Sequence, residues 1–559
     1  MHPVVHKIAA TKEAMPPGTF VGVDPAAEVT ALRADTSGAE PASSEAFDVV
    51  VLGGGLAGLC AAHRLAKRGV KRVVLLEAAD AIGGNARSGG DCPLGAGYVP
   101  VPSRRSKLHE FAQLLKELGV TRRDVCRAPV ERLYMRAEER WQRAGLVYYD
   151  VAPFRTSADR AEQRRFRGKI EAFATRRGRD GRFAFVLPVA ACSRDPTICE
   201  LDKESAADWL AAHGFRTAAL RWYVDYCLRD DYGTAARDCS AWVMLHYFCA
   251  RGRETLYTWP DGLGHVAEAL AARLAKAGVD VRTRAPALRC VARAGGVAVT
   301  YAAGGGAPVL REVTAAHAVC ALPRYAAAAL LDSPEAAGPP LAYAPWVVSN
   351  LRVAAPPAGT AWDNVAYDAA AADGAPAADG DLSRASLGFV VSTHQRRFRG
   401  NCLDALRRPR PAVLTLYAAF ADGDPDAQRA ALAARSREDL AAAAVAEVAR
   451  SHPGAPSAVR AVDVRVLPRA MAKPSPGFLE RVFGATAAPR SALGGALVFA
   501  HTDMSLPLVE EAHFWGATAA DAVCRARGDA GAVFRLNTPA RALVQTDAQE
   551  ELALATPTL

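Results

Sequence analysis

The chain has 559 residues and a formal net charge of +9, with 50% hydrophobic and 23% charged residues. This balance is typical of globular proteins and excludes extensive disorder, and the length exceeds what one compact core usually holds. Twelve cysteines are spread along the chain without a CxxC pair. Their spacing excludes the common zinc motifs and a small disulfide framework, so we predict no metal site and reduced, mostly buried thiols.

The beginning of the chain contains no recognisable targeting segment. The first residues, MHPVVHKIAATKEAMPPGTF, lack the apolar centre of a signal peptide and a twin arginine, and no run of about 18 apolar residues follows anywhere. We expect a soluble cytoplasmic protein without a membrane span, or a periplasmic one if a leader has been removed. Residues 1–45 are rich in Ala, Pro, Gly and Ser, which predicts an N-terminal arm or linker.

A strand, a glycine turn and a helix are predicted in residues 47–76. Gly53, Gly55 and Gly58 have the G-x-G-x-x-G spacing, and a second strand ends at Glu77. The first glycine allows a tight turn, the second lets the backbone approach a diphosphate, and the third lets the helix pack on the strand. Glu77 can accept hydrogen bonds from a ribose 2′-OH and would repel a 2′-phosphate. The unit therefore predicts a dinucleotide site that disfavours NADP-type ligands.

The next 150 residues are predicted to be mainly helical. LHEFAQLLKELG and SAADWLAAHGFRTAALRWYVDYCLRDDYG place apolar residues three and four apart. The densest basic stretch, Arg164–Arg182, has Phe166, Ile170 and Phe173 at helical spacing. We interpret it as an amphipathic helix with a solvated basic face, in preference to a site for an anionic partner. A nucleic-acid site would interleave basic and aromatic residues on one face, so no nucleic acid is expected.

Elements typical of nucleotide-binding folds return in the middle and near the end of the chain. LYTWPDGLGHVAEALAARLAKAGVDVRTR predicts a glycine turn, a helix and a strand, ALRCVARAGGVAVTY a hairpin, and AHAVCALP a buried strand. SLGFVVST and AVLTLYAAF predict strands, DAQRAALAARSREDLAAAAVAEVARS a helix or helix pair, GALVFAHTD a strand and VEEAHFWGATAADAVCRA a helix. This order predicts an α/β fold in which a Rossmann-like domain is interleaved with an α+β substrate domain. The predicted segments are 46–105, 255–325 and 465–530 for the Rossmann-like domain, 106–254 and 326–464 for the substrate domain, and 531–559 for a C-terminal tail.

The segment GGNARSGG begins with Gly83 and Gly84, six residues after Glu77. Here, and in WPDGLGHVAEAL, AVCALPR and VFAHTDMSLPLVEEAHFWGATAADAV, the sequence resembles the flavin amine oxidase superfamily. PPGTF, PLGAGYVPVPS, RWYVDYCLRDDYG, AWDNVAYD and SLGFVVSTHQ are similar to a bacterial group of FAD-dependent oxidoreductases that includes spermidine dehydrogenase-like proteins. The resemblance extends from about residue 16 to residue 527 and implies an amine-oxidase-like fold that binds FAD. It implies FAD-binding roles for Gly53, Gly55, Leu56, Ala57, Gly58, Glu77, Ala78, Gly83, Gly84, Asn85, Ala86, Arg87, Asp503 and Glu510.

Several positions depart from the amine oxidase pattern. Asn85 follows the Gly-Gly pair where the family usually has arginine, and Ser349 or Asn350 stands at the position matched to the family's flavin-adjacent lysine. Leu508 replaces an aromatic residue of the amine cage, and no cysteine for a covalent flavin is recognisable. These departures weaken an assignment as a monoamine oxidase and leave the FAD assignment unaffected.

Four side chains are candidates for the reacting site. The sequence places His394 just past a predicted strand, Asn350 at the lysine position, His501 after the last strand, and Tyr98 close behind the Gly-Gly segment. A structural role is open for each of them, because histidine and tyrosine are often satisfied core residues. The isoalloxazine carries the redox chemistry, so no diagnostic catalytic side chain is required.

We expect an FAD-dependent oxidoreductase that oxidises a small amine-type substrate by hydride transfer to flavin N5. In RDDYG, Asp230 or Asp231 could bind a cationic substrate, although a salt bridge or helix cap explains them equally well. Two alternatives are open: a desaturase- or isomerase-like flavoenzyme acting on C–C bonds of an apolar substrate, and a non-catalytic flavin-binding protein. Acidic groups in the pocket would favour an amine, and a long apolar tunnel would favour the first alternative. Oxygen, a quinone or a cytochrome could reoxidise the flavin, and the sequence leaves a homodimer open.

Overall fold

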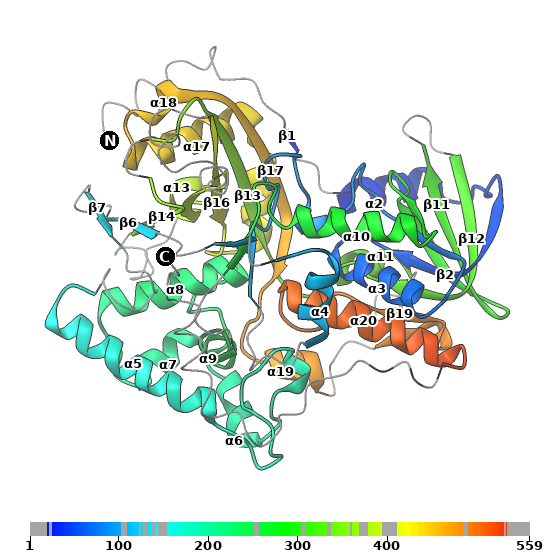
Figure 1. Cartoon of the computed structure of the whole chain (residues 1–559), viewed down its shortest axis with the longest axis horizontal. Helices are drawn as coiled ribbons and strands as arrows, with labels where there is room; N and C mark the ends of the chain where they lie inside the picture. The colour runs from blue at the N-terminus through cyan, green and yellow to red at the C-terminus, as the bar shows by residue number, and fades with distance from the viewer. Residues whose placement is uncertain are drawn as a thin grey trace.

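The described part of the chain forms two eight-stranded sheets, each at the centre of one lobe, and one three-stranded sheet with the order β4-β8-β5 (Figure 1). The three short strands are β4 (Tyr98–Pro100), β5 (Val125–Cys126) and β8 (Leu256–Thr258). The computed structural model describes residues 20–21, 25–101, 109–121, 124–126, 131–135, 140–143, 154–250, 256–304, 309–331, 337–357, 360–367, 378–393, 411–484, 490–529, 531 and 533.

One lobe is built on a sheet with a parallel centre. β2 lies between β3 and β12, β3 also pairs with β9, and these pairings are all parallel. The long strand β12 pairs with the hairpin β10–β11 along its first half and with β19 at its end. Val49–Leu52 of β2 are fully buried, as expected for a strand covered on both faces. The strands are β2 (Ser44–Leu52), β3 (Val73–Leu76), β9 (Asp280–Arg282), β10 (Ala287–Arg293), β11 (Gly296–Ala303), β12 (Val309–Cys320), β18 (Ser491–Ala492) and β19 (Leu497–Phe499).

Helix α3 leaves β2 through the glycine turn and packs against α10 and α20 (Figure 1). Leu59 and Leu65 of α3 are fully buried, which explains the apolar spacing of the helix. α20 approaches closely because Gly516 has no side chain: a Cβ there would lie 2.3 Å from the carbonyl oxygen of Ala57. The helices of this lobe are α3 (Leu56–Lys67), α4 (His109–Glu117), α10 (Gly264–Lys276), α11 (Arg324–Leu330) and α20 (Val509–Ala526).

The sheet of the other lobe is mainly antiparallel, with the order β1-β17-β13-β16-β15-β14-β6-β7. On β13, Val347 and Leu351 enter a core shared with α17. Asn350 and Arg352 alternate onto the opposite face, because successive side chains of a strand point to opposite sides. The elements are β1 (Phe20–Val21), β6 (Glu131–Met135), β7 (Arg140–Arg143), β13 (Tyr343–Val353), β14 (Asp363–Tyr367), α13 (Leu382–Ala385), β15 (Ser386–Val391), β16 (Ala412–Ala419), α16 (Pro425–Ala433), α17 (Arg437–Ser451), α18 (Ala455–Ala458) and β17 (Val459–Ala472).

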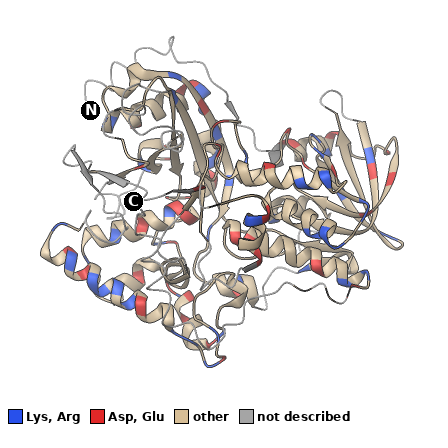
Figure 2. Cartoon of the chain, in the orientation of Figure 1, with Lys and Arg blue, Asp and Glu red and all other residues tan. Residues whose placement is uncertain are grey.

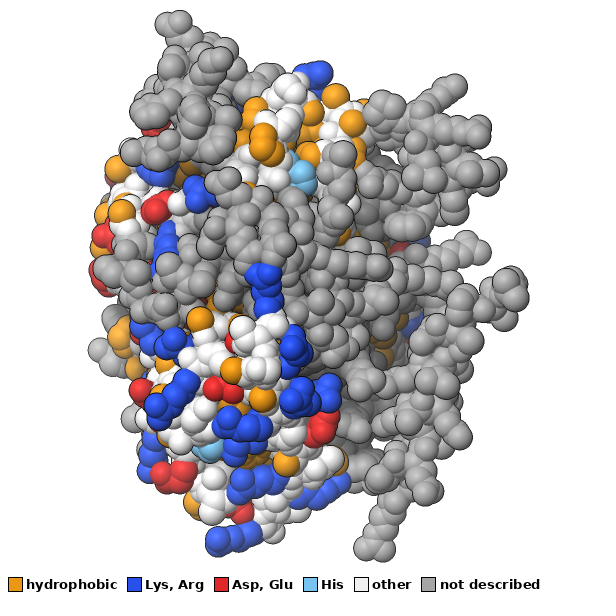
Figure 3. Space-filling view, turned by 90° about the vertical axis from the view of Figure 1, so that its left-hand side faces the viewer, with side chains coloured by type: hydrophobic (Ala, Val, Ile, Leu, Met, Phe, Trp, Pro, Cys, Tyr) orange, Lys and Arg blue, Asp and Glu red, His pale blue; other side chains and the backbone are white. Residues whose placement is uncertain are grey.

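A helical layer completes this lobe, and its helix α5 carries the predicted basic face. Thr156 and Asp159 form a capping box at the start of α5, and Phe166 and Ile170 are buried beneath it. Blue Lys and Arg positions recur along the ribbon of this helix in Figure 2, and blue side chains gather on the lower half of the face seen in Figure 3. The amphipathic helix was therefore predicted correctly. The helices are α5 (Ser157–Thr175), α6 (Pro196–Cys199), α7 (Ala206–Ala212), α8 (Ala218–Tyr232), α9 (Ala241–Ala250) and α19 (Phe478–Phe483).

The structure differs from the predicted segments at two places. Within residues 1–45, predicted as an arm or linker, helix α2 (Pro25–Asp35) packs Val29 and Leu32 against the β10–β12 part of the sheet. The helix could not be recognised from the sequence, because only Val29 and Leu32 form its apolar face and the remaining residues are mostly alanine and polar. The predicted boundary at residue 465 falls inside β17, which pairs with β13 as far as Ala472. The last segment of the Rossmann-like lobe therefore begins after this strand.

No helix in the described ranges is long and apolar enough to cross a membrane. The same residues contain no group of three or more His, Cys, Asp or Glu side chains placed to hold a metal ion. Free thiols are present at Cys60, Cys92, Cys192, Cys199, Cys227, Cys239, Cys249, Cys290, Cys320 and Cys524. The helix pair expected in residues 426–451 is present as α16 and α17.

Candidate active site

The glycine turn after β2 brings the backbone to the N-terminus of α3. Gly53 has a φ of +100°, in the left-handed region that favours glycine, and its amide donates to Leu76 O at 2.8 Å. Gly55 caps α3, and a Cβ at this position would meet no other atom within 4 Å. At Gly58 a Cβ would lie 1.9 Å from Gly53 O, so only glycine lets the helix begin this close to the turn. The first amides of α3 have no partner within the helix and are available to an anion.

The carboxylate of Glu77 lies against the same turn. Its Oε2 accepts a hydrogen bond from the Gly54 amide at 2.6 Å, and its Oε1 accepts one from the Ala79 amide at 2.8 Å. Burial raises the pKa of Glu77, while these two amides and the nearby Arg87 and Arg465 act in the opposite direction. The two amides fix the orientation of a carboxylate at the end of β3, where a ribose hydroxyl is expected.

Gly83 and Gly84 lie directly on the glycine turn. Gly83 forms a parallel bridge with Gly55, and its amide donates to Gly54 O at 2.8 Å. Both glycines have positive φ angles, and a Cβ at Gly84 would lie 3.2 Å from Gly55 Cα. The two glycine segments thus form one backbone surface at the start of α3.

The residues after the Gly-Gly pair extend this surface. Asn85 Nδ2 donates to Ala470 O of β17 at 2.6 Å, and Arg87 pairs with Asp80 at 2.7 Å. Arg87 Nε is buried and has no hydrogen-bond partner among the described residues. This orphaned donor, the unpaired helix amides and the oriented carboxylate fit the diphosphate and ribose of FAD. The predicted residues that the structure brings together here are Gly53, Gly55, Leu56, Ala57, Gly58, Glu77, Ala78, Gly83, Gly84, Asn85, Ala86 and Arg87; their contacts with FAD stay predictions.

His501 and Asp503 follow β19, at the same edge of the sheet as the glycine turn. The Asp503 amide donates to His501 Nδ1 at 3.2 Å, so in a neutral imidazole the proton is on Nε2. Burial lowers the pKa of His501 to about 4, which keeps the ring neutral at neutral pH. Asp503 Oδ2 accepts hydrogen bonds from the Arg324 amide at 2.8 Å and from the Tyr343 hydroxyl.

These contacts give Asp503 a structural role at the end of β19, and its predicted role in FAD binding stays a prediction. Glu510 is buried in the first turn of α20, with an exposure of 4%, and its predicted role likewise stays a prediction.

Asn350, one of the two residues predicted at the family's lysine position, forms a hydrogen bond through each end of its amide. Asn350 Nδ2 donates to Pro93 O at 2.7 Å, and its Oδ1 accepts from the Thr415 hydroxyl at 2.7 Å. Ser349 alternates onto the face of β13 that α17 covers. Asn350 is therefore the residue that faces the loop after Gly83 and Gly84, and its side chain orients that loop. His394 lies outside the described residues.

An acidic pair, the half-buried Asp230 and the buried Asp363, lies at the far end of this loop. The hydroxyl of Tyr98 donates to Asp230 Oδ2 at 2.9 Å, and its ring meets Trp362 edge to face at 5.9 Å. Asp363, next to Trp362, is 8% exposed, and burial followed by the charge of Asp230 raises its pKa. The Tyr417 hydroxyl is buried without a hydrogen-bond partner among the described residues, and burial and Asp230 raise its pKa as well.

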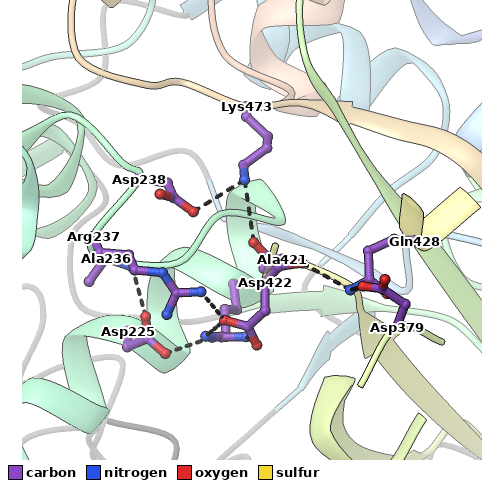
Figure 4. Close-up of polar contacts among 10 residues, drawn as sticks. Asp225, Ala236, Arg237, Asp238, Asp379, Ala421, Asp422, Gln428 and Lys473 are labelled. Carbon is purple, nitrogen blue, oxygen red and sulfur yellow. Dashed lines mark hydrogen bonds and ion pairs between the residues drawn. The ribbon is translucent and has the colours of Figure 1, made fainter. Parts of the chain in front are cut away.

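An ion-pair network fixes the end of α8 that carries Asp230 (Figure 4). Arg229 donates to both carboxylate oxygens of Asp422 at 2.7 and 2.8 Å and to Asp225 at 2.6 Å. Arg237 adds a further contact with Asp422 at 2.6 Å. Within RDDYG, the arginine is thus structural and holds the helix, and Asp230 is directed toward Tyr98.

Sequence reasoning missed three residues of this region: Asp363, Tyr417 and Arg465. The segment AWDNVAYD contains Asp363, but only the pairing of β14 with β15 and β6 shows that this carboxylate is buried. Arg465 stands in the run VDVRV, where a charge between buried valines is a usable indication of a functional position.

Comparisons with known proteins place this geometry in a family. The sequence matches the family described as "Flavin containing amine oxidoreductase" over residues 56–524. The structure of putrescine oxidase bound to putrescine is similar, with a TM-score of 0.58 at 18% identity, over 86% of this chain and 100% of that one. Cyclohexylamine oxidase from Brevibacterium oxydans IH-35A gives 0.58 at 16% identity, over 86% and 99%. A protoporphyrinogen oxidase-like protein from Exiguobacterium sp. 255-15 gives 0.56 at 13% identity, over 85% and 98%.

One curated protein shares a short segment with the chain. Protein anon-37Cs of Drosophila melanogaster is 39% identical over 82 residues, which are 14% of this chain and 16% of that protein. The chain thus matches only about a sixth of the length of that relative.

The chain belongs to the flavin-containing amine oxidoreductase family, because the family match covers most of its length. It is by class an FAD-dependent oxidoreductase, and its cofactor is FAD. The predicted resemblance, the α/β fold class with a Rossmann-like FAD lobe and the FAD assignment are confirmed.

Proposed function

We propose that this FAD-dependent oxidoreductase oxidises the C–N bond of a cationic amine. The proposal rests on the acidic pair Asp230 and Asp363, which lies at the end of the loop that starts at the FAD glycines. A buried carboxyl group beside a half-buried one attracts a cation, since partial burial lowers the local dielectric and strengthens the interaction. An apolar substrate would gain nothing from them.

The protonation state of the pair suits one ammonium group. Burial raises the pKa of Asp363, and the neighbouring Asp230 raises it further, so Asp363 is protonated at neutral pH. The pair then carries about one negative charge between its two carboxyl groups. Tyr98 donates to Asp230 and orients its oxygens, and the rings of Tyr98 and Trp362 supply aromatic surface beside a bound cation.

FAD, when bound, supplies the two-electron acceptor, and the protein supplies orientation and charge. The reacting nitrogen first releases its proton to water; the neutral amine then loses a hydride to the flavin from the carbon next to nitrogen, and water hydrolyses the resulting iminium ion to an aldehyde and ammonium. Asn350 holds the loop between the FAD surface and the acidic pair through Pro93 O. Its amide is engaged by Thr415 as well, so it orients the loop and does not act as a base.

A second candidate is oxidation of a C–C bond in an apolar substrate. Asn350 favours it, because no amine-type side chain stands at the position matched to the family's lysine. The similarity to a protoporphyrinogen oxidase-like protein is compatible with it. The acidic pair weighs against it, since an apolar substrate makes no charge interaction with carboxyl groups.

Anaerobic reduction of the FAD-loaded protein tests the proposal. We expect putrescine or another primary amine to bleach the flavin, and apolar isoprenoids to leave it oxidised. Asp230→Asn should raise the amine concentration for half-maximal bleaching about thirtyfold or more, because one carboxyl group of the pair is lost. Asp231→Asn is the matched control, since its side chain points about 100° away around the helix. Equal effects of both variants, or bleaching by isoprenoids alone, would contradict the proposal.

A further inference from the structure

Arg465 reaches from the second sheet into the FAD-binding surface. It lies on β17 and is 9% exposed. Its Nη2 donates to Gly84 O at 3.1 Å, and its Nη1 donates to Leu94 O at 2.8 Å. Gly84 packs closely on Gly55, the residue that caps α3: a Cβ on Gly84 would lie 3.2 Å from Gly55 Cα. The guanidinium is therefore one residue away from the helix terminus at which a diphosphate is expected.

The positive charge of Arg465 is not matched by an ion pair. Among the residues that the structure describes, its hydrogen bonds go only to the two carbonyl oxygens, and no carboxylate pairs with it. Glu77 is near, but both of its oxygens accept from backbone amides. Burial and, to a smaller extent, the charge of Arg87 lower the pKa of Arg465 to about 10, while the charge of Glu77 acts in the opposite direction. Arg87 lies near but is paired with Asp80, so of these two arginines only Arg465 lacks an ion pair among the described residues.

A neighbouring arginine shows the usual arrangement. Arg352 lies on β13, beside β17, and it also contacts the loop after the Gly-Gly pair. It donates to Asp91 at 2.7 Å and to Asp463 at 2.9 Å, so its charge is compensated within the chain. A buried cation without such a partner is costly, and proteins keep one where a ligand supplies the opposite charge.

We infer that Arg465 is a positioning residue for FAD whose counter-charge is the FAD diphosphate. It holds Gly84 against the start of α3 and adds its charge to that of Arg87 beside the helix terminus. The FAD site is consequently completed by a side chain from the other lobe, and cofactor retention depends on the seating of β17. This inference does not depend on which substrate the enzyme oxidises.

Release of FAD from the holoenzyme tests the inference. The rate is followed after dilution as the recovery of free-flavin fluorescence, and it requires no turnover. Arg465→Gln should accelerate release about tenfold to hundredfold, the effect of losing a charged hydrogen-bonding group. Arg465→Lys, which keeps the charge and loses the two-pronged contact, should stay within about threefold of the wild type. Arg352→Gln is the control for loss of a loop contact without loss of an uncompensated charge, and it should also stay within about threefold.

Three results would overturn the inference. Release from Arg465→Gln at the wild-type rate would show that the diphosphate does not need this charge. Equal acceleration by Arg465→Lys would reduce the role of Arg465 to its hydrogen bonds with Gly84 and Leu94. Equal acceleration by Arg352→Gln would show that any disturbance of the loop suffices. Arg465→Gln that is purified without FAD but has the far-ultraviolet circular dichroism spectrum of the wild type supports the inference. If this variant is unfolded, the release rate of Arg465→Lys relative to the wild type decides instead.

Discussion

The ion-pair network at the end of α8 makes a quantitative prediction for Asp422→Asn (Figure 4). Burial alone would raise the pKa of Asp422, but Arg229 and Arg237 outweigh it and lower the pKa from 3.8 to about 2. This shift corresponds to about 2.5 kcal/mol of stability at neutral pH. The substitution also leaves Arg229 buried with Asp225 as its remaining partner in the network, and breaking a buried pair costs about 3 to 5 kcal/mol. We expect a loss of about 3 kcal/mol.

The assay is the thermal midpoint of the FAD-loaded protein at pH 7. A loss of about 3 kcal/mol should lower the midpoint by about 3 °C in a chain of this length. The control is Asp426→Asn, whose carboxylate pairs with Arg429 on the surface with its side chain 81% exposed, and which should cost less than about 1 kcal/mol. Because the pKa of Asp422 is lowered by folding, its contribution is complete above the unfolded pKa near 4 and is lost as the pH falls toward 2. Equal midpoints for the two variants would refute the reasoning.

Three further predictions concern the FAD surface and the acidic pair. Gly58→Ala should abolish FAD binding, since the added Cβ would lie 1.9 Å from Gly53 O in the turn. Gly55→Ala should keep the wild-type melting profile but lose FAD affinity, because its methyl group meets no protein atom and enters the space where the diphosphate is expected. Flavin absorbance after purification checks both variants. Burial raises the pKa of Asp363, so its contribution to stability is complete below pH 4 and is lost as the pH rises toward the folded pKa. Asp363→Asn should therefore reduce the difference in thermal midpoint between pH 5 and pH 8. The same difference in the wild type and the variant would contradict this prediction. His501 has a pKa of about 4 and is neutral from pH 6 to pH 9. The apparent pKa values of the pH–rate profile in this range should therefore be the same for the wild type and for His501→Asn. A shift of one of these apparent pKa values in the variant would contradict this prediction.

The FAD lobe could be predicted from sequence because its determinants are local. The glycine spacing, the strand that ends at Glu77 and the pair Gly83 and Gly84 lie within about 40 residues and follow from backbone sterics. Gly58, for instance, is required by one contact with Gly53 O. Even the interleaving of the lobe was visible, since each return to the sheet has its own strand and helix pattern.

The acidic pair and Arg465 could not be predicted in the same way, because they depend on contacts between distant parts of the chain. Asp230 and Asp363 come together only when α8 packs beside the second sheet, and RDDYG by itself fits a salt bridge equally well. The structure has a salt bridge in this segment, formed by Arg229 with Asp422, and it also directs Asp230 toward Tyr98. The predicted boundary at residue 465 falls inside β17 for a related reason: the strand pairs with β13 as far as Ala472, and the composition does not change at residue 465.

The most direct test of the account is anaerobic reduction of the bound flavin by a diamine. FAD-loaded protein is mixed with putrescine in the absence of oxygen, and the oxidised-flavin absorption band is followed over time for the wild type and for Asp230→Asn. The account predicts that the amine bleaches the wild-type flavin and that Asp230→Asn requires about thirtyfold more amine for the same effect. A flavin that stays oxidised with every amine, while an apolar substrate bleaches it, would contradict the central claim.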